Sequence, residues 1–320
     1  MSLDLIKSPR GAFNLILVLL CALMPFMAPL IGQDFYTDVF ARTMVWAIAA
    51  VSLNLIMGYG GMISFGHAVY IGVGGYAVGI LTFHGIENAY IQWPVALAAS
   101  GLVALIFGAI SLRTRGVYFI MITLAFTQMV HFFSVSLEKY GSDDGLTIDA
   151  RSDFSIPFFD LNDGITLYYL IFVLMMLSIY TTHKIVNSRF GMVIRGAMSN
   201  DDRMRSIGYP TYGYKLTAFV IAGVMCGLSG ILSANLEDFV SPDMMSWPRS
   251  GDLIFMVVLG GMGTIFGPLG GAIVFWLLSE FLSDITEHWH LIFGPFLILV
   301  VLFARGGLEG IIDQLGGRRG

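Results

Sequence analysis

The chain has 320 residues, of which 56% are hydrophobic and only 12% are charged, and its mean hydropathy is +0.78. A soluble globular protein of this length needs more polar surface, so the composition excludes that class and indicates an integral membrane protein. The formal net charge of −5 says little about partners, because in a membrane protein the distribution of charge among the loops is the informative quantity.

Apolar segments recur along the whole chain. Taking roughly 15 to 25 residues per membrane span, we count candidate spans at residues 12–32, 39–58, 66–84, 93–112, 116–137, 166–182, 215–236, 252–266, 269–283 and 290–305. Only Gly267 and Pro268 separate the eighth from the ninth, so these are two crossings or one broken or re-entrant element. We therefore expect an all-α polytopic membrane protein, with residues 1–320 as one domain and about ten transmembrane helices, broken or short near the glycine-rich segments.

A glycine-rich segment between the second and third spans is the first candidate site. Lipid cannot satisfy the backbone groups that such a break frees, so they are buried in protein or line a water-filled cavity. One interpretation is a broken helix beside a translocation path, with candidate residues Asn54, Gly60, Gly61, Ser64, Phe65, Gly66 and His67. The alternative is close helix packing, with Gly75-x-x-x-Gly79 letting two backbones approach. We assign Gly223-x-x-x-Gly227 and Gly267-x-x-x-Gly271 to such packing seams.

The basic residues predict the orientation, because Lys and Arg in short loops are retained in the cytoplasm. With alternating spans, four basic clusters fall on the same side: Lys7 and Arg10, then Arg113 and Arg115, then the segment 183–215, and finally Arg305, Arg318 and Arg319. The loop 138–165, which has seven acidic residues against Lys139 and Arg151, falls on the other side. Both termini are therefore predicted to be cytoplasmic and the loop 138–165 to be periplasmic.

The cytoplasmic loop 183–215 has six Lys or Arg residues against only Asp201 and Asp202. Ser199 is a candidate helix cap, and Gly208 is a candidate terminator, so we predict a short helix over about 200–208, roughly 12 Å long. Met204 and Ile207 would form an apolar knob on it, as a helix that docks into a partner's groove needs. The alternative is an amphipathic loop lying on anionic lipid.

Two further patterns bear on function. The sequence Gly60-Gly61-Met62 returns at Gly260-Gly261-Met262, and paired glycine interruptions mark transporter cores, although coincidence is as good an explanation in a chain with 38 glycines. There is no Gly-x4-Gly-Lys-Ser/Thr segment, no cluster typical of a metal or hydrolytic site, and no basic stripe for nucleic acid. We therefore expect no enzyme activity, no cofactor or metal and no nucleic-acid partner.

Three blocks of sequence resemble one known family. They run from Leu53-Asn54 to His67-Ala68, from Phe239 to Met245 and from Met256 to Pro268. In these blocks, and along nearly its whole length, the chain resembles the permease subunits of bacterial branched-chain amino-acid ABC importers, of the LivM type in the LivH/LivM family. The resemblance implies a multi-pass inner-membrane subunit that works with a homologous permease, a periplasmic substrate-binding protein and two ABC ATPase subunits, which bind the ATP and Mg.

The resemblance also implies a coupling helix that contacts the ATPase. It maps onto Ser199, Asn200, Asp201, Asp202, Arg203, Met204, Arg205, Ser206, Ile207 and Gly208. This chain departs from the family where small residues are usual, because it has Arg203 and Met204 there. This departure bears on which ATPase is the partner, and less on whether there is one.

The sequence leaves alternatives open for the transported substrate and for the class of transporter. The resemblance favours branched-chain or related hydrophobic amino acids, but related permeases serve urea, amides or aromatic and other organic acids. The rival from another class is a self-sufficient secondary transporter or channel. Such a transporter commonly needs mid-span carboxylates for a coupling ion, whereas the acids of this chain cluster in loops and at span ends.

Overall fold

The computed structural model describes residues 9–31, 35–155, 160–286, 288–303 and 306–316. Six helices in these ranges are long and apolar enough to cross a membrane: α1 (Pro9–Ile31), α2 (Phe35–Met57), α4 (Ala89–Ser111), α5 (Val117–Val135), α6 (Gly164–Val186) and α9 (Thr211–Glu237). Shorter apolar helices are α3 (Ala68–Phe83), α11 (Gly267–Ile285) and α12 (Trp289–Phe303). The predicted all-α class is confirmed. Each of the ten expected segments falls on a helix, and six of these helices have the length and composition of a full span.

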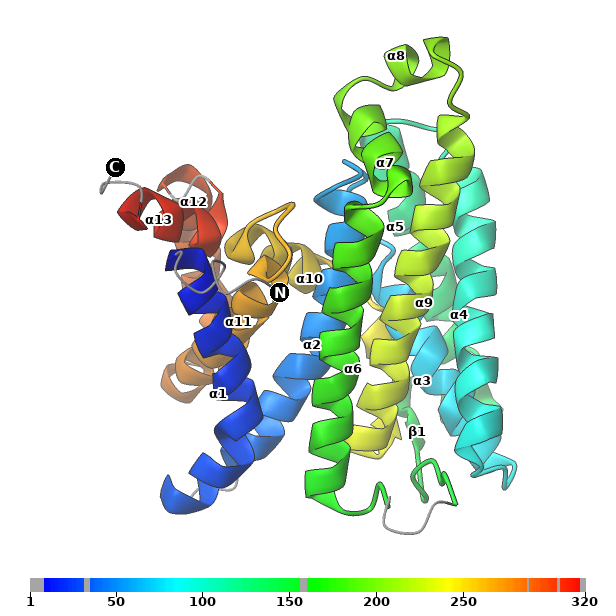
Figure 1. Ribbon diagram of the computed structural model, residues 1–320. Coiled ribbons are helices and arrows are strands. Elements are labelled where there is room, and N and C mark those ends of the chain that lie inside the picture. Colours follow the sequence, from blue (N-terminus) through cyan, green and yellow to red (C-terminus); the bar gives the residue numbers. More distant parts are fainter. Residues whose placement is uncertain (1–8, 32–34, 156–159, 287, 304–305, 317–320) are drawn as a thin grey trace.

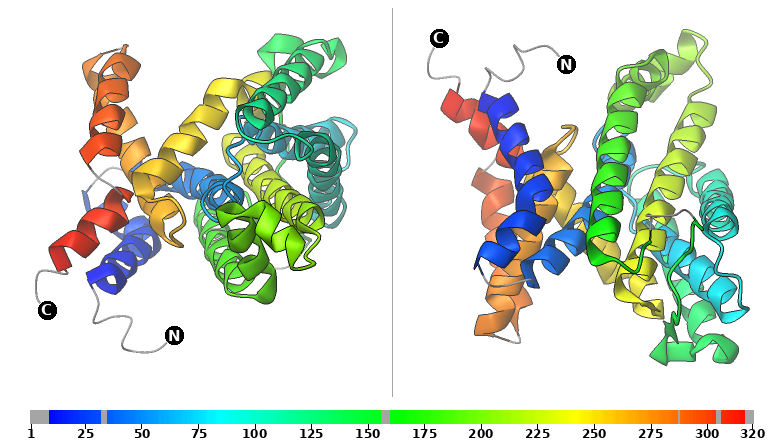
Figure 2. Two further views of the ribbon diagram at one scale, coloured as in Figure 1. Left: turned by 90° about the horizontal axis from the view of Figure 1, so that it is seen from above. Right: turned by 60° about the horizontal axis from the view of Figure 1, so that its bottom comes forward.

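Helix α2 lies at the centre and joins two groups of helices. Figures 1 and 2 show α1, α10 (Trp247–Gly260), α11, α12 and α13 (Gly307–Gly316) on one side of it, and α3 to α9 on the other. In the most apolar stretch of α2, 89% of the residues are buried, against 22% in α1 and α5. A helix that is apolar all round packs inside a protein, whereas α1 and α5 expose large apolar side chains over most of their length, as a lipid-facing surface requires.

Glycines allow several of these helices to pack at backbone distance. A Cβ atom added at Gly227 of α9 would collide with Ser100 of α4, and one added at Gly230 would collide with the Ile71 carbonyl of α3. A Cβ atom at Gly271 of α11 would collide with the Met256 carbonyl of α10. The two glycine pairs assigned to packing seams therefore lie in such seams.

The loop between α5 and α6 is tied to the end of α9. The strand β1 (Leu146–Thr147) pairs antiparallel with β2 (Phe239–Val240), and the 3-10 helices η2 (Glu138–Tyr140), η3 (Ser142–Asp144) and η4 (Pro242–Met245) flank them. The Arg151 guanidinium donates two hydrogen bonds of 2.9 Å to the Asp238 carboxylate. This acidic loop therefore packs against the bundle, at the end opposite to α8 (Figure 1).

The basic segment 183–215 forms the other end of the molecule. After α6 the chain forms α7 (Arg189–Ser199) and α8 (Asp201–Ser206), and α8 projects beyond the ends of α7 and α9 (Figure 1). Arg115, which precedes α5, bonds to Asp201 of α8, so two of the basic clusters share this end. Lys7, Arg305, Arg318 and Arg319 lie outside the described residues.

One expected boundary was wrong. The break between the eighth and ninth segments was predicted at Gly267 and Pro268, but α10 ends at Gly260 and α11 begins at Gly267. Gly261 and Gly263 have φ angles of +121° and +74°, which a helix cannot contain, so the chain leaves the helix there. Pro268 instead lies in the first turn of α11, where proline costs no hydrogen bond.

Candidate functional site

The side chain of Asn54 joins the two glycine-rich breaks. Its Nδ2 donates to the Thr264 carbonyl at 2.7 Å, and its Oδ1 accepts from the Gly263 amide at 2.9 Å. The break that follows α2 and the break that follows α10 therefore lie side by side, although 210 residues separate Asn54 from Thr264. The two segments with the repeated Gly-Gly-Met sequence are thus held together by one amide.

Two of the predicted path residues, Ser64 and His67, are completely enclosed by protein. The Ser64 hydroxyl accepts a hydrogen bond from the Gly66 amide at 3.2 Å. The His67 ring Nε2 lies 2.8 Å from the Ser52 hydroxyl of α2. Both side chains are therefore used in fixing the break between α2 and α3.

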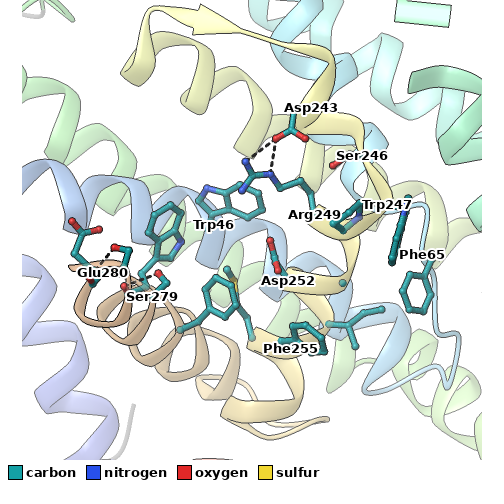
Figure 3. A pocket seen from close by; sticks show the side chains of 17 residues that line it. Trp46, Phe65, Asp243, Ser246, Trp247, Arg249, Asp252, Phe255, Ser279 and Glu280 are labelled. Atoms are coloured by element: carbon teal, nitrogen blue, oxygen red, sulfur yellow. Dashed lines mark hydrogen bonds and ion pairs between the residues drawn. The ribbon is translucent and has the colours of Figure 1, made fainter. Parts of the chain in front are cut away.

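Phe65 is held by helix α5 and faces a cavity. The Thr123 hydroxyl accepts from the Phe65 amide at 3.2 Å, and the Thr127 hydroxyl donates to the Phe65 carbonyl at 2.9 Å. These two bonds fix the backbone while the phenyl ring lines the cavity drawn in Figure 3. Gly60 and Gly61 line a second, smaller cavity of about 290 Å³, which also reaches Asp201 of α8.

The cavity beside Phe65 has a volume of about 830 Å³ and lies between α2, η4, α10 and α11 (Figure 3). Small-molecule sites typically measure roughly 300–1,000 Å³. Its walls combine aromatic side chains (Trp46, Phe65, Trp247, Phe255, Phe275 and Trp276) with the charged side chains of Asp243, Arg249, Asp252 and Glu280. The arrangement suits a small solute that has both charged and apolar parts.

Arg249 is the positive charge at this cavity. Its Nη2 and Nε donate to the same Asp243 oxygen, at 2.8 and 3.1 Å, and the guanidinium lies 5.8 Å from the centre of the Trp46 ring. The side chain keeps 41% of its surface exposed. Arg249 is thus oriented by two neighbours and still open to the cavity.

Sequence reasoning did not single out this cavity. It placed the acids of the chain in loops and at span ends, whereas Asp252 and Glu280 line the cavity wall. A usable signal was present in the sequence from Trp247 to Asp252, where an indole and two opposite charges occupy the first turns of an apolar helix. Charged side chains beside or inside a predicted span are functional candidates by default.

Helix α8 is fixed to the bundle through Asp201. The carboxylate of this residue lies 2.7 Å from Arg115, 3.0 Å from Arg205 and 3.0 Å from Lys215 of α9. Burial raises the pKa of Asp201, but hydrogen bonds from Lys215 and Thr211 and the charges of Lys215 and Arg205 outweigh it and hold the pKa below its ordinary value. Asp201 is therefore charged at neutral pH, and it links α8 to α9 and to the segment before α5.

The predicted cap of α8 was wrong, and the helix is slightly shorter than expected. The Asn200 side chain accepts from the Arg203 amide at 2.9 Å and so caps the helix, because Ser199 is the last residue of α7. The helix covers Asp201–Ser206 instead of residues 200–208. Gly208 ends the turn as expected, in a left-handed conformation with φ +94°.

The apolar knob predicted from Met204 and Ile207 is not formed, because only one of the two side chains faces outward. The Met204 side chain packs back onto Gly196 of α7, so it stabilises the α7–α8 pair instead of facing outward. Ile207 is 63% exposed, and Arg203 and Ser206 beside it are exposed as well. The outward face of this segment therefore has one apolar side chain, with charged and polar neighbours.

Comparison with known proteins gives a family. A family model described as the permease component of branched-chain amino acid transport systems matches residues 35–302. The high-affinity branched-chain amino acid transport system permease protein LivM of Salmonella typhimurium is 25% identical over 318 residues, which cover 92% of this chain and 74% of that protein. LivM of Escherichia coli gives the same figures. A probable branched-chain amino acid transport permease protein LivH of Methanocaldococcus jannaschii is 25% identical over 261 residues, 75% of this chain and 79% of that protein. No solved structure matches.

Proposed function

The chain belongs to the permease components of branched-chain amino-acid transport systems, of the LivM type, and from this membership we propose that it forms, with a homologous permease, the membrane path of an ABC importer. Two separate ATPase subunits supply the energy, and a periplasmic binding protein supplies the substrate. The proposed substrates are branched-chain or related hydrophobic amino acids. The proposed location is the bacterial inner membrane, with α8 in the cytoplasm and the loop 138–165 in the periplasm.

The projecting position of α8 is the observation that supports this proposal most directly (Figure 1). A conformational equilibrium shifts only through a contact whose free energy differs between the two states. Closure of the ATPase dimer must therefore reach this subunit through a contact outside the bundle, and α8 is anchored to α9 and to the start of α5 by Asp201. Force applied to α8 is thus transmitted to two membrane helices.

The geometry separates six of the coupling residues 199–208 into two groups. We propose that Arg203, Ser206 and Ile207 contact the ATPase, because they are exposed on the projecting segment. Asn200, Asp201 and Met204 instead hold α8 in place through the cap, the ion pairs and the packing on α7.

The predicted path residues are divided in the same way. In this proposal Phe65, Gly60 and Gly61 border the path, because they line cavities. Asn54, Ser64, Gly66 and His67 shape the path from within the protein, because they are buried.

The test is the substitution Ile207→Asp in the complete transporter, reconstituted in proteoliposomes. A charge placed in an apolar contact is left unpaired, so we expect ATP-dependent uptake of L-leucine and co-purification of the ATPase to fall by about tenfold or more, equivalent to roughly 1.4 kcal/mol. The matched control is Ile165→Asp, because Ile165 is also highly exposed, at 58%, but lies at the opposite end of the bundle. It should leave co-purification of the ATPase unchanged. Unchanged uptake by Ile207→Asp, or accumulation of L-leucine by the purified chain alone, would contradict the proposal.

A further inference from the structure

We propose that the 830 Å³ cavity between α2, η4, α10 and α11 binds the zwitterion of an α-amino acid, with Asp252 accepting hydrogen bonds from its ammonium group and Arg249 donating hydrogen bonds to its carboxylate. The aromatic wall around Phe255 then contacts the substrate's side chain (Figure 3). This inference rests on the proposed function and assigns its substrate class to named residues.

The charge balance of the cavity favours a cationic group. Three carboxylates, those of Asp243, Asp252 and Glu280, line the cavity with a single guanidinium, that of Arg249. Asp243 is paired with Arg249, whereas no hydrogen bond or ion pair from the described residues reaches the carboxylates of Asp252 and Glu280. A carboxylate removed from bulk water is costly unless a cation or several donors compensate for it. An ammonium group supplies both its charge and three donors.

Arg249 still has donors for a carboxylate. A guanidinium has five N–H groups, and the two bonds to Asp243 use one each from Nε and Nη2. The contact with the Trp46 ring and the bonds to Asp243 orient the group while it stays partly exposed. A pre-oriented guanidinium of this kind suits recognition of a substrate carboxylate.

Two buried donors give further support for a polar ligand. The Trp276 Nε1 and the Ser246 hydroxyl belong to the cavity wall and have no hydrogen-bond partner in the part of the chain that the structure describes. Buried polar groups are normally hydrogen-bonded, so an unpaired donor in a cavity wall calls for a partner. Further apolar wall residues, including Ile254 and Phe275, suit a hydrophobic side chain.

This chemistry separates the alternative substrates. An organic acid without an ammonium group would bring a negative charge to a cavity with an excess of carboxylates. Urea and simple amides have no cation for Asp252 and no apolar part for the aromatic wall. A hydrophobic amino acid matches all three features.

The test measures the reactivity of a cysteine placed in the cavity. Both cysteines of this chain, Cys21 and Cys226, are buried, so Ser283→Cys at an exposed position, or Ser279→Cys as a second variant, gives this chain one reactive thiol at the cavity. The complex in nanodiscs is assembled with partner subunits that contain no cysteine. The probes are a cationic and an anionic methanethiosulfonate reagent of similar size. We expect the cationic reagent to react several-fold faster, and this ratio to fall when Asp252→Asn is added. L-leucine should slow the labelling, whereas its 2-hydroxy acid analogue, which lacks the ammonium group, should not.

The control site is Thr147→Cys, which is exposed in β1 on the periplasmic side of the proposed topology and whose labelling L-leucine should leave unchanged. Equal rates for the two reagents, equal protection by the hydroxy acid, or no labelling because a partner permease or lipid covers the cavity would each overturn the inference. A wild-type complex without ATP-dependent uptake would instead contradict the proposed function, since the labelling experiment does not depend on transport.

Discussion

At the scale of single residues, Asn54 shows how one buried amide can hold two distant turns. Both ends of the amide are used, one to accept from Gly263 and the other to donate to Thr264. Removing the amide leaves both half-buried backbone groups without these bonds. An unpaired buried polar group costs about 1–3 kcal/mol, so the loss should exceed that of an ordinary surface substitution.

We therefore predict that Asn54→Ala lowers the free energy of unfolding by about 2–4 kcal/mol. The measurement is an SDS titration of the purified protein in mixed micelles, followed by circular dichroism. Asn54→Asp should cost at least as much, because it retains an acceptor for Gly263 but opposes the Thr264 carbonyl with a second acceptor. Asn162→Ala in the exposed outer loop is the control and should change stability by less than about 0.5 kcal/mol. Equal stability of the Asn54 and Asn162 variants would show that the two hydrogen bonds of Asn54 do not stabilise the protein.

Individual residues were predictable only where the local pattern determines them. Asn54 and His67 stand out as polar residues in apolar segments, but their contacts come from residues that are distant in the sequence or on another helix. Ile207 was expected to face outward and is 63% exposed, whereas Met204 packs on Gly196, which depends on the angle between α7 and α8.

At the scale of elements, α9 contains two glycines with opposite surroundings. Gly227 lies against Ser100 of α4, whereas Gly213 has no atom within 4 Å of the position that a Cβ would take. The same Gly→Ala substitution therefore adds a methyl group to a closed seam at one position and to open space at the other. The difference isolates helix packing from helix propensity.

We predict that Gly227→Ala destabilises the protein by about 1–3 kcal/mol through overpacking. Gly213→Ala should be neutral or stabilise it by up to about 1 kcal/mol, because alanine restricts the unfolded chain more than glycine does. Both changes are read in the same SDS titration. A destabilisation of similar size at both positions would contradict the assignment of the seam.

Elements were more predictable from the sequence than their ends. The apolar segments located the membrane helices, because burial in lipid or protein requires long apolar runs. The ends of α8 and α10 were misplaced, because the sequence offers two capping residues, Ser199 and Asn200, and several glycines near residue 260. Which of them ends a helix depends on the backbone conformation, such as the positive φ of Gly261.

At the scale of the whole molecule, helix α5 connects the two candidate regions. Arg115, just before α5, bonds to Asp201 of α8, and Thr127 in the helix bonds to the Phe65 carbonyl beside the cavity. Further along, the His131 ring Nδ1 lies 3.0 Å from the carbonyl of Pro242 in η4. Helix α5 therefore contacts both α8, through the residue that precedes it, and the wall of the cavity.

This connection predicts that Thr127→Val weakens the link between ATP hydrolysis and uptake. Loss of one hydrogen bond removes about 1 kcal/mol, so uptake per ATP hydrolysed should fall about fivefold while hydrolysis continues. Uptake and phosphate release are measured in the same proteoliposomes. Thr217→Val is the matched control, because the Thr217 hydroxyl bonds only within its own exposed turn of α9. An unchanged ratio in Thr127→Val would exclude α5 as the connection.

Composition alone identified the class of the molecule, since 56% hydrophobic residues leave no alternative to a membrane protein at this length. The cavity could not be predicted in this way. Its walls come from α2, η4, α10 and α11, so Trp46 and Glu280 meet there only after the chain has folded. The periodicity of apolar residues within one segment does not tell which distant segments will pack against each other.

The central position of α2 has a consequence for the order of assembly during synthesis. The Ser229 hydroxyl donates to the Val45 carbonyl 184 residues earlier, and Thr264 reaches Asn54 across 210 residues. At typical translation rates the ribosome needs about 10 to 40 s to add 210 residues. During that interval α2 of the nascent chain has been synthesised, but the residues of α9 and of the segment after α10 that bond to it have not. The last third of the polypeptide is therefore what completes the centre of the bundle.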